Sequence, residues 1–141
     1  HPRGQFTAQP DTRMVVEADD LLQRLASPEL TLIDARALPR FRGEIEPLDP
    51  VAGHIPGAYC APFTENLDAS GRLLPRAQLR QRFERLLDGR SPASLVAYCG
   101  SGVTACHNLL ALSLAGLPLA PLYPGSWSEW ITDPARPVAT K

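Results

Sequence analysis

The chain contains 141 residues, of which 44% are hydrophobic and 21% are charged, so its length and composition are typical of a single domain with one hydrophobic core. Its net charge of −1 excludes the broad basic surface that binds nucleic acid or an anionic membrane. No apolar run approaches the roughly 20 residues of a membrane helix, and no charged segment leads into a signal-peptide core, so we expect no membrane partner.

The first elements in chain order are a linker, a short strand, a helix and a buried strand. Residues 1–12 show no apolar periodicity, and we expect them to be a linker that follows another domain, with the folded domain over 13–141. Residues 14–16 are apolar and form a possible edge strand. Leucines on one face predict a helix over 18–25, and the apolar residues that follow predict a buried strand over 31–34.

The middle of the chain combines a long loop with a well-marked helix. Residues 35–57 are rich in proline, glycine and charge, which predicts a loop, and residues 58–60 predict a short strand. A helix begins near Pro75, because proline is favoured in a first turn, and ends with Gly89 as its C-cap. The apolar face of this helix contains Leu79, Phe83, Leu86 and Leu87. We expect that face to pack on the core.

The last third of the chain predicts a strand, an uncharged helix and a further strand. Residues 94–98 are mostly apolar, and Cys99 follows them. The helix over 103–114 contains no charged residue, so we expect most of its circumference to be buried, and residues 119–123 are a candidate last strand. Strands that alternate with helices are typical of an α/β fold with a parallel sheet and helices on both faces. In such sheets ligands bind beyond the carboxyl ends of the strands, where Cys99 lies.

Cys99 is followed by a glycine loop and then by a helix N-terminus. Gly100 and Gly102 allow positive φ angles and a close approach of the backbone, so that successive N–H groups converge on one point. The helix adds about half a positive charge there, and the hydroxyl groups of Ser101 and Thr104 are further donors. Such a cradle favours thiolate, the reactive form of cysteine, without a formal positive charge. We expect Cys99 to be a nucleophile; the alternative is a buried structural thiol.

Two other loop chemistries are disfavoured by the residues present. A phosphate-binding P-loop needs a lysine, but the only lysine in the chain is Lys141. A cysteine-dependent phosphatase or arsenate-reductase-like enzyme needs an arginine six positions after its cysteine, where this chain has Ala105. The loop therefore lacks the cation that would hold a phosphate.

The remaining cysteines and histidines favour structural positions. Three cysteines do not make a disulfide framework, so we expect a reducing, cytoplasmic location. We expect Cys60 and Cys106 to lie in the core, with a resolving thiol as the alternative for Cys106. The histidines lack metal-ligand spacing, which predicts neither a metal site nor a cofactor, and we interpret His54 as a structural loop residue.

Several segments together resemble the rhodanese family of sulfurtransferases, most closely the C-terminal catalytic domain of the tandem-domain thiosulfate and 3-mercaptopyruvate enzymes. These segments are Cys-Gly-Ser-Gly-Val-Thr-Ala at 99–105, Asp-Ala-Arg at 34–36, Arg-Phe-Arg-Gly at 40–43, Gly-His-Ile-Pro-Gly-Ala at 53–58 and Tyr-Pro-Gly-Ser-Trp at 123–127. The resemblance implies a rhodanese-like three-layer domain with a small parallel β-sheet flanked by helices. It also implies an enzyme that moves a sulfane sulfur from a small-molecule donor to a thiol or cyanide acceptor.

The resemblance implies roles for Cys99, for the loop that follows it and for the arginines of the motifs. Cys99 is implied to attack the donor and to carry the sulfur as a persulfide. The residues implied to bind the substrate are Arg40, Gly100, Ser101, Gly102, Val103 and Thr104. The loop amides would hold the outer sulfur, and the guanidinium of Arg40 would pair with the donor's anionic group. Arg36 and Arg42 are either further contacts of this kind or solvated loop arginines.

One position departs from the family pattern. The 3-mercaptopyruvate enzymes commonly carry a second substrate arginine after a Glu-Pro pair, whereas Leu48 follows Glu46-Pro47 here, so the donor stays open between thiosulfate and 3-mercaptopyruvate. Further family contacts come from an N-terminal rhodanese domain, which we expect as the partner of this one. The alternative to an enzyme is a non-catalytic rhodanese module that serves in binding. Such modules typically lack the cysteine, which is present here as Cys99.

Overall fold

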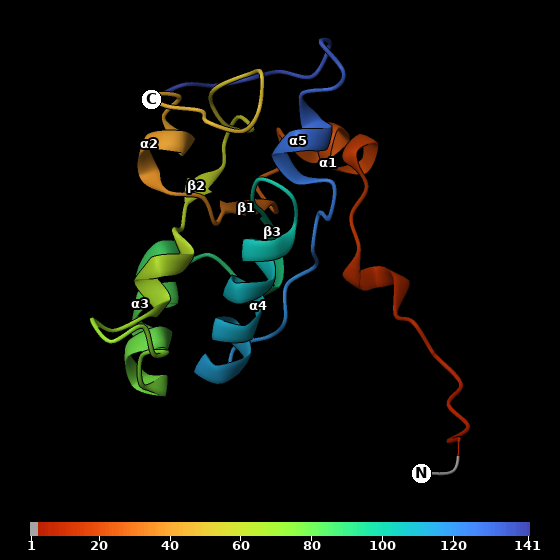
Figure 1. Cartoon of the computed structure of the whole chain (residues 1–141), viewed down its shortest axis with the longest axis vertical. Coiled ribbons are helices and arrows are strands. Elements are labelled where there is room, and N and C mark those ends of the chain that lie inside the picture. The colour runs from red at the N-terminus through yellow and green to blue at the C-terminus, as the bar shows by residue number, and fades with distance from the viewer. Residues whose placement is uncertain (1–2) are drawn as a thin grey trace.

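The computed structural model describes residues 3–141 as helices around a small sheet (Figure 1). The α-helices are α1 (Ala18–Arg24), α2 (Leu38–Phe41), α3 (Arg76–Leu87), α4 (Val103–Ala115) and α5 (Ser126–Trp130). The strands are β1 (Thr31–Asp34), β2 (Tyr59–Cys60) and β3 (Leu95–Tyr98), and the 3₁₀ helices are η1 (Thr12–Met14), η2 (Phe63–Asn66) and η3 (Pro92–Ser94).

The three strands form a parallel sheet in the order β2-β1-β3. Asp34 at the end of β1 pairs with Cys60 of β2 on one side and with Tyr98 of β3 on the other. All three strands therefore end at the same edge of the sheet. Cys99 leaves this edge directly from β3.

The two predicted outer strands are shorter in the structure than in the sequence analysis. Residues 119–123 contribute only isolated bridges, in which Leu122 pairs with Ala97 and with Val15. The first predicted strand is limited to this same bridge at Val15. Pro121 has no N–H to donate, and a residue of this kind interrupts the ladder of a sheet.

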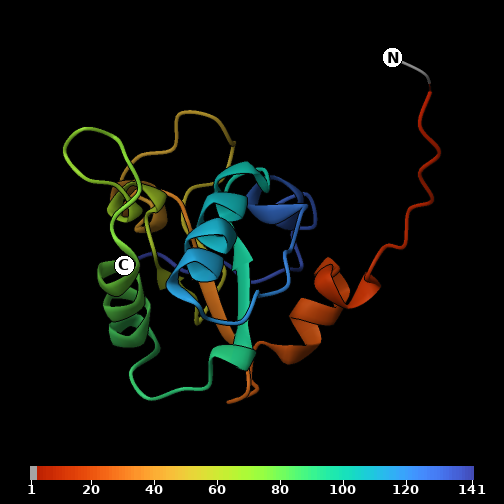
Figure 2. The same cartoon turned by 90° about the horizontal axis from the view of Figure 1, so that it is seen from below.

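Helices cover both faces of the sheet, with α3 and α4 on one side and α1 and α5 on the other (Figures 1 and 2). Ile33 and Ala97 point into the cluster that contains α3 and α4. Their neighbours Leu32 and Val96 point into the opposite cluster with Trp127 and the rest of α5. This alternation is the period of two expected for strands, and it confirms the three-layer α/β fold.

The predicted burial of α4 is wrong for one of its faces. The helix is uncharged, yet Val103, Leu110 and Leu114 are 72%, 49% and 43% exposed. Cys106 lies on the exposed part of the helix as well, so its predicted place in the core is also wrong. The reason is that α4 packs on β3, η2 and α3, and no other described element covers its outer side.

Helix α3 begins after Pro75 as predicted, but its C-cap is Asp88 and not Gly89. Asp88 has a φ of 48°, which a short polar side chain tolerates in the left-handed region. The predicted apolar face is confirmed, because the side chains of Leu79, Phe83 and Leu87 are buried against the core.

The predicted loop over 35–57 contains the single-turn helix α2 and is held together by His54. The Nδ1–H of this buried side chain donates to the Phe41 carbonyl at 2.7 Å, and the two rings stack at 3.7 Å. Its backbone N–H donates to the Ala139 carbonyl at 2.8 Å. His54 is therefore a structural residue, as the sequence analysis expected.

The N-terminal segment lies outside the packed layers. Residues 3–11 form no helix or strand and extend away from the rest of the chain in both views (Figures 1 and 2). His1 and Pro2, which also belong to the predicted linker, lie outside the described residues. Among residues 3–141, no helix combines the length and the apolar character needed to cross a membrane.

The packing of α3 against α4 predicts a large effect of Phe83→Ala. Phe83 is fully buried, so truncation leaves a cavity, and the free energy of unfolding should fall by about 3–5 kcal/mol. Arg80→Ala is the matched control on the same helix: its exposed ion pair with Glu84 contributes at most about 1 kcal/mol. Urea denaturation followed by circular dichroism measures both, and equal losses would contradict the packing described here.

The environment of His54 predicts a pH dependence of stability. Burial lowers the pKa of His54 in spite of its bond to the Phe41 carbonyl, whereas an unfolded histidine titrates near about 6.5. Below that pH the unfolded chain takes up a proton that the folded chain resists, so the free energy of unfolding falls with acidification. We expect His54→Gln to be less sensitive to pH between about 7 and about 5. Denaturation curves at several pH values give the free energy of unfolding of each protein. If this free energy falls with acidification as steeply in the variant as in the parent, the assignment is wrong.

Candidate active site

The backbone of Cys99 is held in place by the start of α5. Its N–H donates to Ser126 Oγ at 3.1 Å, and its carbonyl accepts the Trp127 N–H at 3.0 Å. The Gly100 carbonyl accepts the Ser128 N–H at 2.9 Å. In a trans peptide the carbonyl and the next N–H point in opposite directions, so the N–H groups of Gly100 and Ser101 point away from α5. The α5 segment thus orients the loop that follows β3.

The N–H groups of residues 100–105 have no hydrogen-bond acceptor among the described residues. The last three belong to the first turn of α4, where helical N–H groups lack a partner. Six consecutive donors and the positive end of a helix 13 residues long therefore lie beside the cysteine. The unpaired donors and the helix N-terminus that the sequence analysis expected after Cys99 are therefore present, and their effect on the sulfur stays a prediction.

The two glycines of the loop have different roles. Gly102 has a φ of 82° and caps α4, and an added Cβ there would come within 2.7 Å of the Pro124 carbonyl oxygen. Gly100 does not adopt a positive φ, so the prediction was wrong for this residue. A single left-handed residue is enough to turn the chain from the strand into the helix.

A pocket of about 210 Å³ opens at this edge of the sheet. It is lined by Arg40, Leu48, Asp49, Cys99, Gly100, Ser101, Val103, Thr104 and Ser128. Cys99 is only 1% exposed and also belongs to the core cluster that contains α3 and α4, while Val103 is 72% and Leu48 78% exposed. The structure thus brings together every predicted site residue except Gly102, which faces Pro124.

Arg40 reaches this pocket from α2 and is neutralised by two acidic side chains. Its Nη2 and Nε lie 2.6 and 3.1 Å from the Glu46 carboxylate, and Nη2 is 3.3 Å from Asp49. Burial raises the pKa of Glu46, but the bonds from Arg40 and from the N–H groups of Leu48 and Asp49 prevail and lower it below its usual value. Nη1 of Arg40 has no partner among the described residues, and a methyl group on Gly100 would lie 3.5 Å from it.

The two neighbouring arginines do not line the pocket. Arg36 is buried, with Nη2 2.6 Å from Asp34 and 2.7 Å from the Gly53 carbonyl, and its guanidinium lies over the Trp127 ring at 4.8 Å. It joins β1, the long loop and α5, which is a structural role. Arg42 is half exposed and lies 3.8 Å from Glu44. Arg42 is therefore a solvated loop arginine, one of the two alternatives, whereas Arg36 fits neither of them because it is buried and bonded within the fold.

Two residues of the pocket were not predicted from the sequence. Ser128 Oγ donates to Asp49 Oδ1 at 2.8 Å, so α5 and the long loop are joined above Arg40. Ser128 follows the Gly-Ser-Trp segment, and its position after that motif was a usable signal. Asp49 stands in a proline-rich loop, and nothing in the sequence pattern indicates that it contacts Arg40.

The other thiols and histidines do not form a second reactive centre. Burial raises the pKa of Cys60 to about 12, which keeps it protonated and unreactive. Cys60 is half-buried at the end of β2, so its predicted place in the core is confirmed only in part. Among the described residues, no group of three or more His, Cys, Asp and Glu side chains could hold a metal ion.

Comparisons with known proteins place this geometry in a family. The model of the rhodanese-like domain matches residues 17–133. The chain is 67% identical, over 97% of its length and 48% of the relative's, to a probable 3-mercaptopyruvate sulfurtransferase of Pseudomonas aeruginosa. It is 43% identical to the human 3-mercaptopyruvate sulfurtransferase, over 95% of the chain and 45% of the relative.

A solved structure agrees with these sequence matches. The crystal structure of the Tum1 protein from Saccharomyces cerevisiae superposes with a TM-score of 0.75 and 32% identity, over 89% of this chain and 46% of the yeast chain. The chain thus spans about half the length of the relatives it matches. The family match over most of the chain, the three-layer fold and the cysteine loop together make this chain a member of the rhodanese-like domain family.

Proposed function

We propose that residues 13–141 are the C-terminal catalytic domain of a sulfurtransferase with two rhodanese domains. It transfers a sulfane sulfur from thiosulfate or 3-mercaptopyruvate to Cys99 and then to a thiol or cyanide. One observation carries this proposal: Cys99 lies in a pocket beside the N–H groups of residues 100–105, which have no acceptor among the described residues. The names of the Pseudomonas and human relatives support the same class of reaction.

The first step loads the sulfur onto the enzyme. The Cys99 thiolate attacks the outer sulfur of thiosulfate, a new S–S bond forms, and sulfite leaves with the electron pair of the broken S–S bond. With 3-mercaptopyruvate the carbon–sulfur bond breaks instead, and the carbon takes up a proton to give pyruvate. The acceptor then attacks the outer sulfur of the persulfide, and Cys99 leaves as a thiolate.

The loop stabilises the negative sulfur in both steps. The attacking thiolate and the outer persulfide sulfur each carry charge close to the start of α4. The N–H groups from Gly100 to Thr104 supply donors that are already oriented, so no reorganisation is needed when the charge moves. Ser101 lines the same pocket, and we propose that its hydroxyl group assists proton transfer to the leaving group.

Arg40 is the residue proposed to bind the anionic group of the donor. Its Nη1 faces Gly100 and has no partner among the described residues, whereas Nε and Nη2 are bonded to Glu46. A donor oxygen that reaches Nη1 also competes with Asp49 for Nη2, since that contact of 3.3 Å is the longest one. Leu48 adds no charge at the mouth of the pocket, so Arg40 acts alone there.

A preceding rhodanese domain is part of this proposal. The relatives are about twice as long as the matched region, and the exposed side chains of Leu48 and Val103 leave the pocket mouth apolar and uncovered. A second domain that packs over this mouth would exclude water from the reacting sulfur. The three free thiols support a reducing compartment such as the cytoplasm as the place of action.

The two alternative functions fit the site less well. A phosphatase needs an arginine at position 105, and Ala105 is fully buried in the core, so its side chain does not face the pocket. A non-catalytic module has no use for a cysteine placed beside six free amides. Neither alternative accounts for the position of Cys99.

The role of Cys99 predicts a covalent intermediate. In the full-length protein, thiosulfate or 3-mercaptopyruvate should add the mass of one sulfur atom, and Cys99→Ser should abolish this gain because no other thiol lies in the pocket. Cys106→Ser is the matched control, since that exposed thiol lies on the outer face of α4 and its loss should change nothing. Intact-mass spectrometry measures the gain, and an unaltered gain in Cys99→Ser would refute the assignment.

The role of Arg40 predicts a selective loss of donor binding. Arg40→Gln should raise the KM for thiosulfate by about tenfold or more, because a charge-assisted hydrogen bond is lost, and should change kcat less. Arg42→Gln removes a neighbouring charge outside the pocket and should leave the KM unchanged. Initial rates at varied donor concentration test both variants, and the same KM in Arg40→Gln and the parent would argue against this contact.

A further inference from the structure

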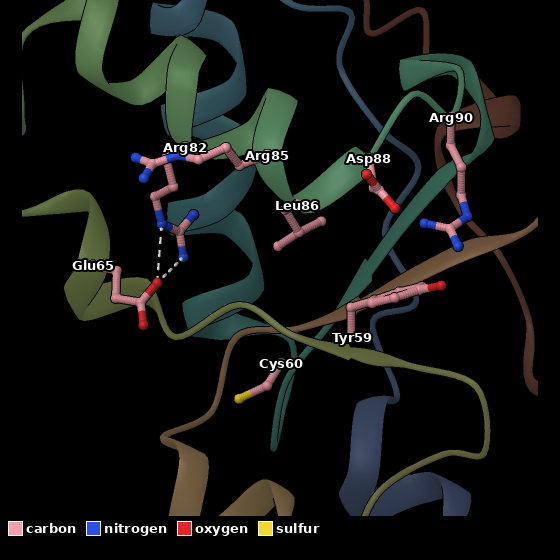
Figure 3. A pocket seen from close by; sticks show the side chains of 8 residues that line it. All are labelled: Tyr59, Cys60, Glu65, Arg82, Arg85, Leu86, Asp88 and Arg90. Atoms are coloured by element: carbon pink, nitrogen blue, oxygen red, sulfur yellow. Dashed lines mark hydrogen bonds and ion pairs between the residues drawn. The ribbon is translucent and has the colours of Figure 1, made fainter.

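We propose that a second pocket, between β2 and the C-terminal half of α3, binds a small organic oxyanion: a phosphate or carboxylate group attached to an apolar or planar body. The pocket has a volume of about 620 Å³, within the range of small-molecule sites. It is lined by Tyr59, Cys60, Glu65, Arg82, Arg85, Leu86, Asp88 and Arg90 (Figure 3). None of these residues lines the pocket of Cys99, so the two sites are separate.

Arg82 is the residue that points to an anionic ligand. Its side chain is only 10% exposed, and its Nη1 is buried without a hydrogen-bond partner among the described residues. A buried donor without an acceptor is unfavourable, so the fold satisfies the charge of Arg82 only in part. Burial also lowers the pKa of Arg82, because the charge is poorly solvated where it lies. An oxyanion at the Nε and Nη2 edge, where Glu65 now lies, would give this charge a stronger partner, while Nη1 keeps its buried position.

The acidic residue already beside Arg82 is a weak partner. The Glu65 carboxylate lies 3.3 and 3.4 Å from Nη2 and Nε, and its side chain is 61% exposed. Such long contacts of an exposed side chain contribute little, so Glu65 can turn into solvent at small cost. The edge that it leaves consists of Nε and Nη2, and Nη2 also donates to the Pro62 carbonyl at 3.0 Å. An oxyanion would bond to Nε and share Nη2 with that carbonyl.

Arg85 provides a second cation at the same end of the pocket. It projects from the next turn of α3 toward the Arg82 side, as Figure 3 shows. Its Nε donates only to the Gln81 carbonyl, at 3.3 Å, and it forms no ion pair among the described residues. Arg82, Arg85 and Glu65 together carry a net charge of +1, and this charge would rise to +2 locally once Glu65 has turned away.

The opposite end of the pocket suits the uncharged body of the ligand. Leu86 and Tyr59 offer an aliphatic and an aromatic surface, and the Arg90 guanidinium lies over the Tyr59 ring at 4.9 Å. Asp88 lines this end beside Arg90 and offsets its charge. The ligand is therefore oriented with its oxyanion at Arg82 and Arg85. Binding is non-covalent, since Cys60 stays protonated.

Phenyl phosphate, benzoate and inorganic phosphate are the probes that test this pocket, titrated at low salt by isothermal calorimetry and by amide chemical shifts. We expect phenyl phosphate or benzoate to bind saturably and more tightly than inorganic phosphate. The stronger of the two organic probes identifies the preferred oxyanion. The absence of saturable binding by both organic probes would overturn the proposal.

Variants of exposed residues localise the binding without disturbing the core. Arg85→Gln should weaken binding by about tenfold, and Glu65→Gln should strengthen it. Arg80→Gln is the matched control, because Arg80 lies on the same helix and pairs with Glu84 outside the pocket. Cys99→Ser should bind as the parent does, which separates this site from the sulfurtransferase reaction. Equal affinity in Arg85→Gln and the parent would refute the assigned position.

Discussion

The start of α5 holds the peptide groups on either side of Gly100, and the chemistry of the site depends on this contact. The carbonyls of Cys99 and Gly100 are both occupied by N–H groups from α5. The loop amides are therefore turned the other way, and those of residues 100–105 are left without acceptors among the described residues. In the proposed reaction such an array would stabilise a sulfur anion through fixed dipoles, which need no counter-ion and no rearrangement.

The arginines near the site differ in their partners, and this difference separates the structural Arg36 from Arg40, which we propose binds the donor. Arg36 is buried and donates hydrogen bonds to Asp34, to the Gly53 carbonyl and, at 3.5 Å, to Glu46. These bonds occupy its N–H groups, so few donors remain for a ligand. Arg40 keeps Nη1 free at the pocket while Glu46 holds the other edge. A guanidinium with one bonded edge and one free edge is oriented before the donor arrives, which lowers the entropic cost of binding.

The pocket beside α3 also pairs an arginine with a carboxylate, but the carboxylate there is held more weakly. In the Cys99 pocket, the carboxylate that holds Arg40 is itself buried and bonded to backbone N–H groups. In the cavity beside α3, the carboxylate that meets Arg82 is exposed and its contacts are long. A small anion can displace the second carboxylate far more easily than the first, because the exposed side chain regains solvation when it leaves.

The sequence by itself predicted the central strands, the long helices α3 and α4, the parallel α/β class and most of the residues that line the Cys99 pocket, but it missed α2 and α5 and extended the outer strands. The loop at Cys99 could be predicted because a strand end, a glycine turn and a helix start are local features, whereas Arg40 was implied by the family resemblance of its motif. Only the tertiary structure decided that Asp49 and Ser128 meet beside Arg40, that the outer face of α4 is uncovered and that Nη1 of Arg82 has no partner among the described residues. Periodicity reports which face of a helix is apolar, but the coverage of that face and the pairing of a charge depend on segments far apart in the chain, whose positions only packing decides.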